Sequence, residues 1–283
     1  MAKQRLDMAL VERGLCESRQ LAQRLIRAGE VQVDHAVIDK PGTPIPPEAT
    51  IQVKARPPYV SRGGEKLAQA LNAFPISVAG RCCLDGGIST GGFTDCLLQR
   101  GAARVYGIDV GYGQVAWSLR QDPRVILRER TNIRHLQPVD LYGAEDLRPD
   151  LGVMDLSFIS LTKVLGALRS LLLPPHEVIL LVKPQFEVGR DRIGKKGVVR
   201  HPEDQAEAIA AVLTAATDLG WQYQGLTPSP ITGPAGNIEY LLWLSSDDGS
   251  DSPDLKSLQS ITEAACRSRR SPPEHLPDRA PDD

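Results

Sequence analysis

The sequence predicts an α/β protein with two parts, a large domain built on a doubly wound sheet and a small α+β domain before it. From residue 81 onward, short apolar runs alternate with amphipathic segments, and a glycine-rich loop follows the first run. Strand–helix alternation of this kind is typical of doubly wound sheets. Strands are expected at 81–85, 104–109, 124–128, 150–155, 178–183, 221–226 and 238–244, and helices at 91–100, 114–121, 160–172 and 203–219.

The small domain is expected between residues 5 and 56. Ser18 has the side chain of a helix cap, and Gly29 ends the helix that follows. One face of this helix is apolar, and the other carries Arg19, Gln23 and Arg27 at a spacing of four, with Arg24 beside them. Such a row suits contacts to phosphates, although a solvated helix face has the same pattern. The candidates for binding a nucleic acid such as RNA are Arg5, Arg19, Arg24, Arg27 and Arg62.

The amino-acid composition excludes few classes of protein. Hydrophobic residues make up 41% of the chain and charged residues 24%, which is ordinary for a soluble domain. The sequence contains no run of about 18 uncharged apolar residues, so no membrane-spanning helix is expected. Its first residues lack the apolar core of a secretory signal, so a cytoplasmic protein is expected. The tail from residue 246 holds nine Asp/Glu against five Lys/Arg, and we expect it to be acidic and disordered. The five cysteines form no Cys-x-x-Cys pair, and no metal site is expected.

The glycine-rich loop lies between the first strand of the large domain and a helix that begins near Phe93. Its spacing is not the Gly-x-Gly-x-x-Gly of dinucleotide sites, because Asp85 opens it. An acid there suits a cationic or hydroxyl-rich ligand better than a pyrophosphate. Asp109 ends the next strand, where its carboxylate can accept the ribose hydroxyls of S-adenosylmethionine. The candidate cofactor residues are Asp85, Gly87, Ser89, Thr90, Gly91, Gly92, Phe93 and Asp109.

Four charged residues lie where apolar runs end, or just before the first strand: Lys66, Asp155, Lys183 and Glu239. Ligands of open α/β sheets bind outside the carboxyl ends of the strands, so these side chains are expected to face one crevice. Lys183 is our candidate general base for a hydroxyl acceptor, since a lysine close to other cations gives up its proton more readily. We expect Asp155 and Lys66 to orient that amine and the acceptor hydroxyl, and Glu239 to hold Lys66 or the ribose. Structural ion pairs are the alternative interpretation.

Other methyl acceptors fit the sequence less well. Adenine N6 methylation usually uses Asn/Asp-Pro-Pro-aromatic after the fourth strand, whereas this chain has Asp155-Leu156-Ser157-Phe158 there. Cytosine C5 methylation needs a nucleophilic cysteine near the same strand ends, and none occurs at that place in the sequence. A hydroxyl acceptor needs neither device, because only its proton has to be removed as the methyl group moves in line to the oxygen.

The motifs resemble those of the TlyA-type (hemolysin A) family, in the same order, over roughly residues 3–244. The matching segments are Ser61-Arg62-Gly63-Gly64-Glu65-Lys66-Leu67, Ser89-Thr90-Gly91-Gly92-Phe93-Thr94, Asp109-Val110-Gly111-Tyr112-Gly113-Gln114, Asp155-Leu156-Ser157-Phe158-Ile159-Ser160, Val182-Lys183-Pro184-Gln185-Phe186-Glu187 and Gly233-Pro234-Ala235-Gly236-Asn237-Ile238-Glu239. The N-terminal segment looks like an S4 RNA-binding domain. Two positions depart from the family pattern: Ile88 is bulkier than usual, and Lys196 stands where glycine is common.

The resemblance implies an S-adenosylmethionine-dependent 2′-O-methyltransferase of ribosomal RNA, acting on cytidine in the 23S and in some members the 16S RNA. It implies an S4-like domain at 1–58, a linker at 59–65 and a Rossmann-like, FtsJ-type domain at 66–245, followed by the tail at 246–283. The family's Lys-Asp-Lys-Glu quartet falls on Lys66, Asp155, Lys183 and Glu239, and Asn132 is expected near the adenine.

Three alternatives remain. A non-catalytic RNA-binding factor for ribosome assembly could have kept the methyltransferase fold. A base methyltransferase could use the same fold, but it would leave the 2′-hydroxyl of its product free. Pore formation, which the hemolysin name suggests, fits poorly with a sequence that has no predicted spanning helix.

Overall fold

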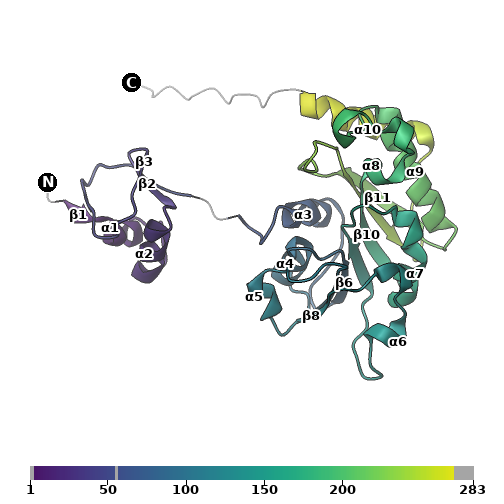
Figure 1. Cartoon of the computed structure of the whole chain (residues 1–283), viewed down its shortest axis with the longest axis horizontal. Helices are drawn as coiled ribbons and strands as arrows, with labels where there is room; N and C mark the ends of the chain where they lie inside the picture. Colours follow the sequence, from purple (N-terminus) through teal and green to yellow (C-terminus); the bar gives the residue numbers. More distant parts are fainter. Residues whose placement is uncertain (1–2, 55–56, 271–283) are drawn as a thin grey trace. The chain divides into compact units, whose positions relative to one another are not determined.

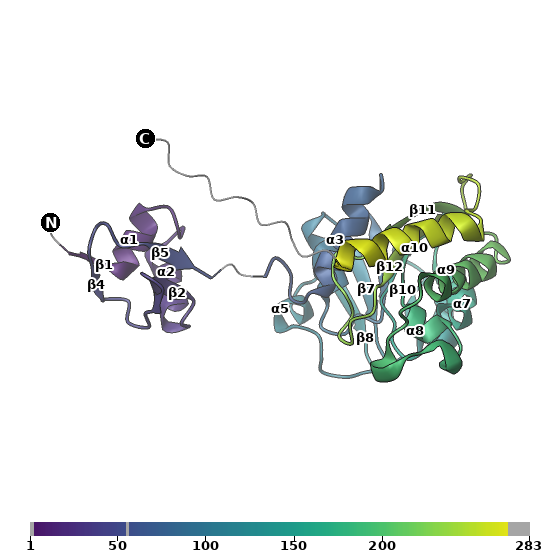
Figure 2. The same ribbon diagram turned by 90° about the horizontal axis from the view of Figure 1, so that it is seen from above.

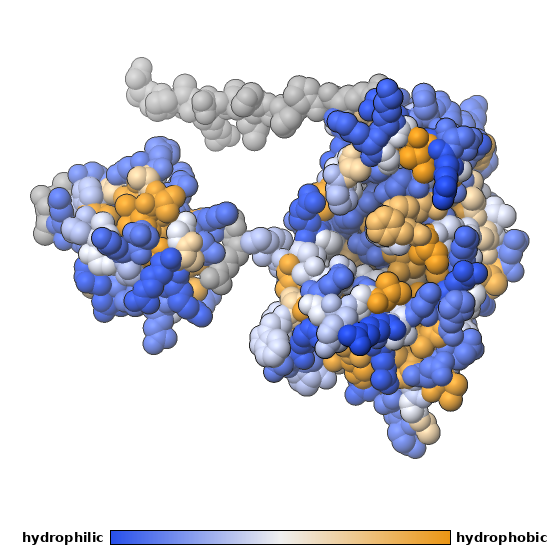
Figure 3. Space-filling view, viewed as in Figure 1, coloured by the Kyte–Doolittle hydropathy of each residue, from blue (hydrophilic) through white to orange (hydrophobic). Residues whose placement is uncertain are grey.

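A computed structural model describes residues 3–54 and 57–270 of the chain (Figure 1). The chain divides into two compact units, Met1–Pro57 and Pro58–Asp283. Each unit has its own buried core, and each is described by itself. In the described residues, no helix is both long and apolar enough to cross a membrane. On the face of the second unit in Figure 3, hydrophobic residues gather near the middle, with hydrophilic residues around them.

The first unit packs two helices against short strands. Its core contains Leu6, Leu10, Leu25 and Ile26, all less than 5% exposed. The side chain of Ser18 caps α2 by accepting a hydrogen bond from the backbone N–H of Leu21 at 3.3 Å, as the sequence predicts. The elements are β1 (Gln4–Arg5), α1 (Leu6–Glu12), α2 (Arg19–Arg27), β2 (Val31–Val33), β3 (Ala36–Val37), β4 (Pro44–Ile45) and β5 (Ile51–Val53).

The second unit is built on a seven-stranded sheet with the order β11-β12-β10-β9-β6-β7-β8. Strands β6 to β10 are parallel, whereas β12 runs antiparallel to both of its neighbours. The doubly wound sheet is therefore confirmed, and each predicted strand lies within two residues of an observed one. The strands are β6 (Cys82–Gly86), β7 (Arg104–Ile108), β8 (Val125–Arg128), β9 (Leu151–Met154), β10 (Glu177–Val182), β11 (Gln222–Pro228) and β12 (Tyr240–Ser245).

Helices cover both faces of this sheet and divide its core in two. Residues of α3, α4 and α5 pack into one cluster, and residues of α6, α7, α9 and α10 into the other. The predicted helix at 160–172 begins instead with a 3-10 turn at Leu161–Lys163. The helices are α3 (Gly63–Ala73), α4 (Gly92–Gln99), α5 (Trp117–Arg120), α6 (Pro138–Leu141), α7 (Leu165–Leu171), α8 (Pro184–Glu187), α9 (Pro202–Thr217) and α10 (Leu255–Arg270).

The prediction of a disordered tail from residue 246 is wrong for residues 255–270, which form α10. Figure 2 shows this helix lying beside α9, with which it makes its main contacts. Leu258, Thr262 and Ala265 are at most 6% exposed, and their spacing puts them on one helical face. Composition does not reveal this apolar face, because its apolar residues are few and only their helical spacing places them together. Residues 271–283 lie outside the described part of the chain.

The start of the second unit also differs from the predicted linker at 59–65. Helix α3 begins at Gly63, so the last three residues of that span already belong to its first turn. Gly64 is required there, because a Cβ atom at this position would lie 2.1 Å from the Tyr59 ring.

A buried carboxylate links the helices of the first unit. Asp7 is fully buried in α1 and accepts hydrogen bonds from Arg5, Arg19 and Gln23. The Arg5 guanidinium makes the largest contribution to holding the pKa of this carboxyl well below its usual range. Because the pKa is lowered on folding, Asp7 stabilises the unit above about pH 4, and this contribution is lost as the pH falls.

We therefore expect Asp7→Asn to lower the free energy of unfolding of this unit by about 1–3 kcal/mol at pH 7, and by less at pH 3. Hydrogen exchange of the α1 and α2 amides, compared with wild type at each pH, measures the difference. A deficit of equal size at both pH values would contradict the assigned role of the charge.

Candidate active site

Four charged side chains meet at the carboxyl edge of the parallel strands. Lys66 comes from α3, Asp155 follows β9, and Lys183 follows β10. Glu239 precedes β12, which runs in the opposite direction, and Tyr240 at the start of β12 pairs with Val182 at the end of β10. The reversed strand therefore brings Glu239 to the same edge as the other three.

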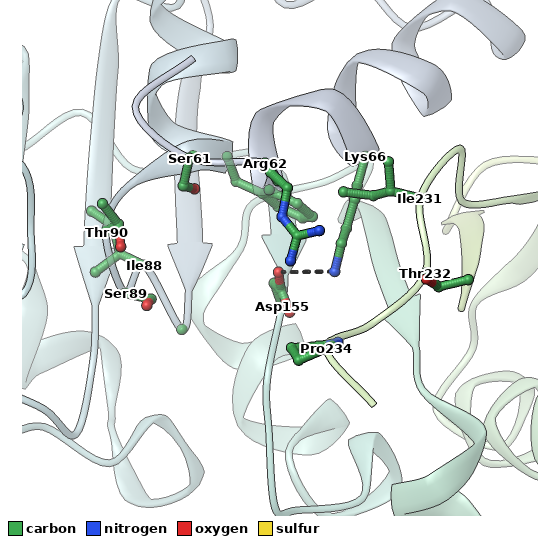
Figure 4. A pocket seen from close by; sticks show the side chains of 14 residues that line it. Ser61, Arg62, Lys66, Ile88, Ser89, Thr90, Asp155, Ile231, Thr232 and Pro234 are labelled. Carbon is green, nitrogen blue, oxygen red and sulfur yellow. Dashed lines mark ion pairs between the residues drawn. The ribbon is translucent and has the colours of Figure 1, made fainter. Parts of the chain in front are cut away.

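These side chains form a chain of alternating charge. The Lys183 amine lies 2.6 Å from Asp155 Oδ1, and the Lys66 amine lies 2.6 Å from Glu239 Oε2. Lys66 also lies 4.0 Å from Asp155 Oδ2, which connects the two pairs. Figure 4 shows Lys66 and Asp155 pointing toward one another, with Arg62 beside them. The structure thus brings together all four residues of the predicted quartet.

The four side chains of the quartet are buried to different degrees. Glu239 is 1% exposed and Lys66 8%, whereas the Asp155 side chain is 22% exposed. A buried charge is tolerated when an opposite charge and hydrogen bonds compensate it. Each cation here has a carboxylate partner, so Asp155 is the member that can meet a ligand at lowest cost.

Asp155 lies between two cavities. The smaller, of about 240 Å³, is the Lys66 cavity, lined by Ser61, Arg62, Gly63, Lys66, Gly87, Ile88, Ser89, Thr90, Gly92, Phe93, Asp155, Ile231, Thr232 and Pro234. The larger, of about 450 Å³, is the Asp109 cavity, lined by Gly87, Ser89, Ile108, Asp109, Val110, Gln114, Thr131, Asn132, Ile133, Asp155, Leu156, Ser157, Phe158, Ile159 and Val164. Both share the glycine loop and Asp155, so two ligands could approach each other at this carboxylate.

The glycine loop between β6 and α4 needs its glycines for steric reasons. Gly87 has a φ of +85°, and a Cβ atom there would lie 2.6 Å from the Asp155 carbonyl oxygen. A Cβ atom at Gly92 would lie 2.3 Å from Ser61 Oγ. Ser89 adopts a φ of +49° without being glycine, and its N–H donates to Asp109 Oδ2 at 2.8 Å. The loop is therefore held close to both cavities.

Asp85 lies fully buried at the end of β6, beneath this loop. The Thr94 hydroxyl donates to its Oδ2 at 2.7 Å, while Oδ1 has no hydrogen-bond partner among the described residues. Burial raises the pKa of this carboxyl to about 7; the Thr94 hydrogen bond opposes that change, and the Asp155 charge adds to it. An incompletely satisfied acid at this place favours a cationic ligand in the adjoining cavities.

Most of the predicted cofactor residues border these cavities. Gly87, Ser89, Thr90, Gly92, Phe93, Asp109 and Asn132 line one or both. Asp85 and Gly91 line neither: Asp85 lies below the loop, and Gly91 has a φ of +102° where the loop enters α4. Asp109 accepts N–H groups from Ser89 and Gly111, which fixes its carboxylate beside the larger cavity.

Two further residues at the site, Ser157 and Phe158, were not among those predicted from the sequence. The Lys183 amine donates to Ser157 Oγ at 2.9 Å, which gives it a second partner beside Asp155. Phe158 is 92% exposed with a φ of +66°, and its ring centroid lies 5.3 Å from that of Phe186. A bulky residue in this conformation is strained, and such strain gathers at functional sites. The available signal was the aromatic residue three positions after Asp155.

The predicted RNA-binding arginines fall into three settings. Arg62 lines the Lys66 cavity. Arg24 and Arg27 are exposed on α2, as a surface for phosphates requires. Arg5 and Arg19 are about half exposed, and both donate to Asp7, so part of their hydrogen-bonding capacity serves the fold.

Comparison with known proteins places both units in families. Residues 59–246 match the family described as FtsJ-like methyltransferase, and residues 4–51 match the S4 domain. "16S/23S rRNA (cytidine-2'-O)-methyltransferase TlyA" of Mycobacterium tuberculosis is 51% identical over 85% of this chain and 89% of its own length. "Putative rRNA methyltransferase YqxC" of Bacillus subtilis is 46% identical over 93% of this chain and 94% of its own.

A solved structure described as "Putative hemolysin from Streptococcus thermophilus" has a TM-score of 0.70 and 40% identity, covering 95% of this chain and 97% of that one. The predicted resemblance is thereby confirmed over both units. This chain, with an S4 domain at its start, belongs to the FtsJ-like methyltransferase family.

Proposed function

We propose that the protein transfers a methyl group from S-adenosylmethionine to the ribose 2′-hydroxyl of a cytidine in ribosomal RNA. The observation that carries the proposal is the position of Asp155, which borders both cavities and contacts the amines of Lys66 and Lys183. The printed activity of the M. tuberculosis relative supports the choice of cytidine and of the 2′-oxygen. The S4 domain supports an RNA substrate.

The Asp109 cavity has the chemistry to hold S-adenosylmethionine. Ile108, Ile133 and Leu156 offer apolar walls for an adenine, Asn132 offers an amide, and Asp109 can accept ribose hydroxyls. The glycine loop leaves room for the amino-acid end, and the Asp85 and Asp155 carboxylates suit its positive charge. When bound there, the cofactor supplies a methyl group activated on a sulfonium sulfur.

The residues of the quartet have complementary roles in this proposal. The reacting form of Lys183 is the neutral amine, which takes the proton from the 2′-hydroxyl, and Asp155 stabilises the ammonium group that forms. Ser157 accepts a second hydrogen bond from the same amine and so limits its orientation. Glu239 holds Lys66, which orients the acceptor oxygen from the wall of the Lys66 cavity.

Arg62 and Phe158 provide surfaces for the acceptor nucleotide. Arg62 can contact a phosphate at the mouth of the Lys66 cavity, and the exposed ring of Phe158 can stack on an unpaired base. Such stacking would suit a nucleotide turned out of its helix to reach an active site.

Transfer of a labelled methyl group to purified ribosomal subunits, followed by nucleoside analysis, tests the function. Labelled 2′-O-methylcytidine is the expected product. A methylated base with a free 2′-hydroxyl would instead indicate a base methyltransferase. RNA binding without any transfer would indicate the non-catalytic factor.

Lys183→Ala is expected to reduce transfer by about 10²-fold to 10⁴-fold, because it removes the proton acceptor. Cofactor affinity should stay within about twofold of wild type, because the lysine does not line the Asp109 cavity. Lys163→Ala, which removes an exposed lysine from the 3-10 turn before α7, is the matched control. An active Lys183→Ala enzyme would rule out the general-base role.

The raised pKa of Asp85 gives a dependence on pH with a definite sign. Since its pKa lies above the unfolded value, the free energy of unfolding falls as the pH rises from about 4 to about 7. Without cofactor, Asp85→Asn should therefore raise Tm at pH 8 more than at pH 5. The same variant should bind S-adenosylmethionine more weakly at pH 8, because it lacks the charge. Thermal scans and titration calorimetry measure the two effects, and a Tm gain that is independent of pH would exclude the burial penalty.

In the first unit, Arg24→Ala with Arg27→Ala should raise the KM for RNA by about tenfold, through lost phosphate contacts. The kcat and the cofactor affinity should change little. Arg24→Lys with Arg27→Lys keeps both charges and should restore most of the loss. An unchanged KM in the alanine variant would show that α2 does not face the RNA.

A further inference from the structure

A strongly basic segment follows the catalytic lysine in the second unit. Residues 189–200, here the basic loop, contain five lysines and arginines and one acid, Asp191. All five cations are exposed. Arg192 pairs with Asp204 and Glu207 of α9. In the described ranges, no carboxylate lies within 4.0 Å of the other four, which are Arg190, Lys195, Lys196 and Arg200.

The basic loop starts at the same edge of the sheet as the quartet. It begins two residues after α8, the single turn that Lys183 leads into. Glu187 at the end of α8 accepts the Leu161 N–H at 2.9 Å and the Ser160 hydroxyl at 2.6 Å. Both partners belong to the segment that follows Asp155. The end of α8, from which the loop starts, is thus held against the chain segment that follows Asp155.

The second half of the basic loop is fastened beside Glu239. Asn237, only 2% exposed, donates to the Gly197 carbonyl at 2.8 Å and accepts the Val199 N–H at 2.9 Å. Gln205 donates to the Val199 carbonyl at 2.9 Å and accepts the Tyr240 hydroxyl at 2.5 Å. Loop contacts therefore reach residues on both sides of Glu239. These buried amides fix the backbone of the loop relative to the quartet.

Lys196 lies at the turn of this fixed backbone with a φ of +71°. Glycine adopts this conformation without strain, whereas lysine does not. Its side chain has no ion pair in the described part of the protein to compensate for that strain. An ordered backbone that presents unpaired cations is suited to binding an anion from outside the protein. The loop offers no exposed large apolar side chain, which argues against a membrane as the partner.

We propose that the basic loop is a second RNA-binding surface, which contacts phosphates of the strand that carries the target nucleotide. The inference rests on the proposed function and adds a place where the second unit itself holds the substrate. The buried amides of Asn237 and Gln205 hold the backbone at Gly197 and Val199, which lie between Lys196 and Arg200. Binding at this surface would therefore set the distance from the RNA backbone to the quartet.

A triple variant of the full-length protein tests the proposal: Lys195→Ala, Lys196→Gly and Arg200→Ala. All three side chains are exposed, and glycine suits the backbone at 196, so folding should be preserved. The matched control is Arg100→Ala, Arg124→Ala and Lys256→Ala, which removes three exposed cations of the second unit that belong neither to the loop nor to the quartet. The probe is protein-free 23S ribosomal RNA, with binding measured from about 50 to 200 mM salt.

The loop variant should lower the slope of log affinity against log salt by about 2, since each phosphate contact contributes about 0.7–0.9. It should raise the KM for RNA at least tenfold and leave the cofactor dissociation constant unchanged. Asn237→Ala, which keeps every loop charge, should raise the same KM without a comparable change in slope.

A slope and KM equal to those of the control would overturn the proposal, and so would a loss confined to cofactor affinity. Failure of the proposed function would be seen separately. Wild-type protein would then transfer no methyl group to RNA, while the salt dependence of binding would still decide whether the loop contacts RNA.

Discussion

The ion chain Glu239–Lys66–Asp155–Lys183 is the constraint on which the rest of this site depends. It joins α3 to the ends of three strands that lie far apart in the sequence, so it forms only when the sheet is complete. Each member compensates a neighbour, and removing one leaves a charge unpaired in a largely buried setting. The main effect of these ion pairs is therefore on geometry and not on stability, because they set where the Lys183 amine lies relative to both cavities.

Reversal of the last strand makes this arrangement possible. Were β12 parallel to β10, its first residues would lie at the amino edge of the sheet, away from Asp155 and Lys183. The antiparallel register places Tyr240 opposite Val182, so the residues just before β12 reach the carboxyl edge. Glu239 then pairs with Lys66, and Asn237 binds the basic loop. One topological feature thus supplies both a member of the quartet and the attachment of a candidate RNA surface.

Patterns that arise within a single element were readable from the sequence. Apolar runs located all seven strands. The charges that follow two parallel strands located Asp155 and Lys183, because such strands end at a common edge. Lys66 lies in α3 and Glu239 precedes the reversed strand, so this rule alone does not place them. Features that depend on neighbours from other elements were not readable. Asp7 accepts hydrogen bonds from Arg5 and Arg19, two of the arginines expected to bind RNA. Helix α10 is stabilised by packing against α9. The contact between Lys183 and Ser157 depends on the relative positions of two strand ends. The family motifs located the cofactor loop but could not show that Asp85 lies beneath it.

Some of the local costs of this fold lie at the site, although left-handed residues also occur away from it, at Asp34, His35 and His176. Asp85 is buried with one oxygen unsatisfied, and Ser89, Phe158 and Lys196 take left-handed conformations that cost of order 1–3 kcal/mol each. No such residue adds to the stability of the isolated protein, so packing elsewhere must offset them. Each becomes favourable only with a ligand: a cation above Asp85, a base against Phe158 or a phosphate beside Lys196. At these four positions the strain lies where a substrate can relieve it, and the basic loop shares that property with the cofactor loop.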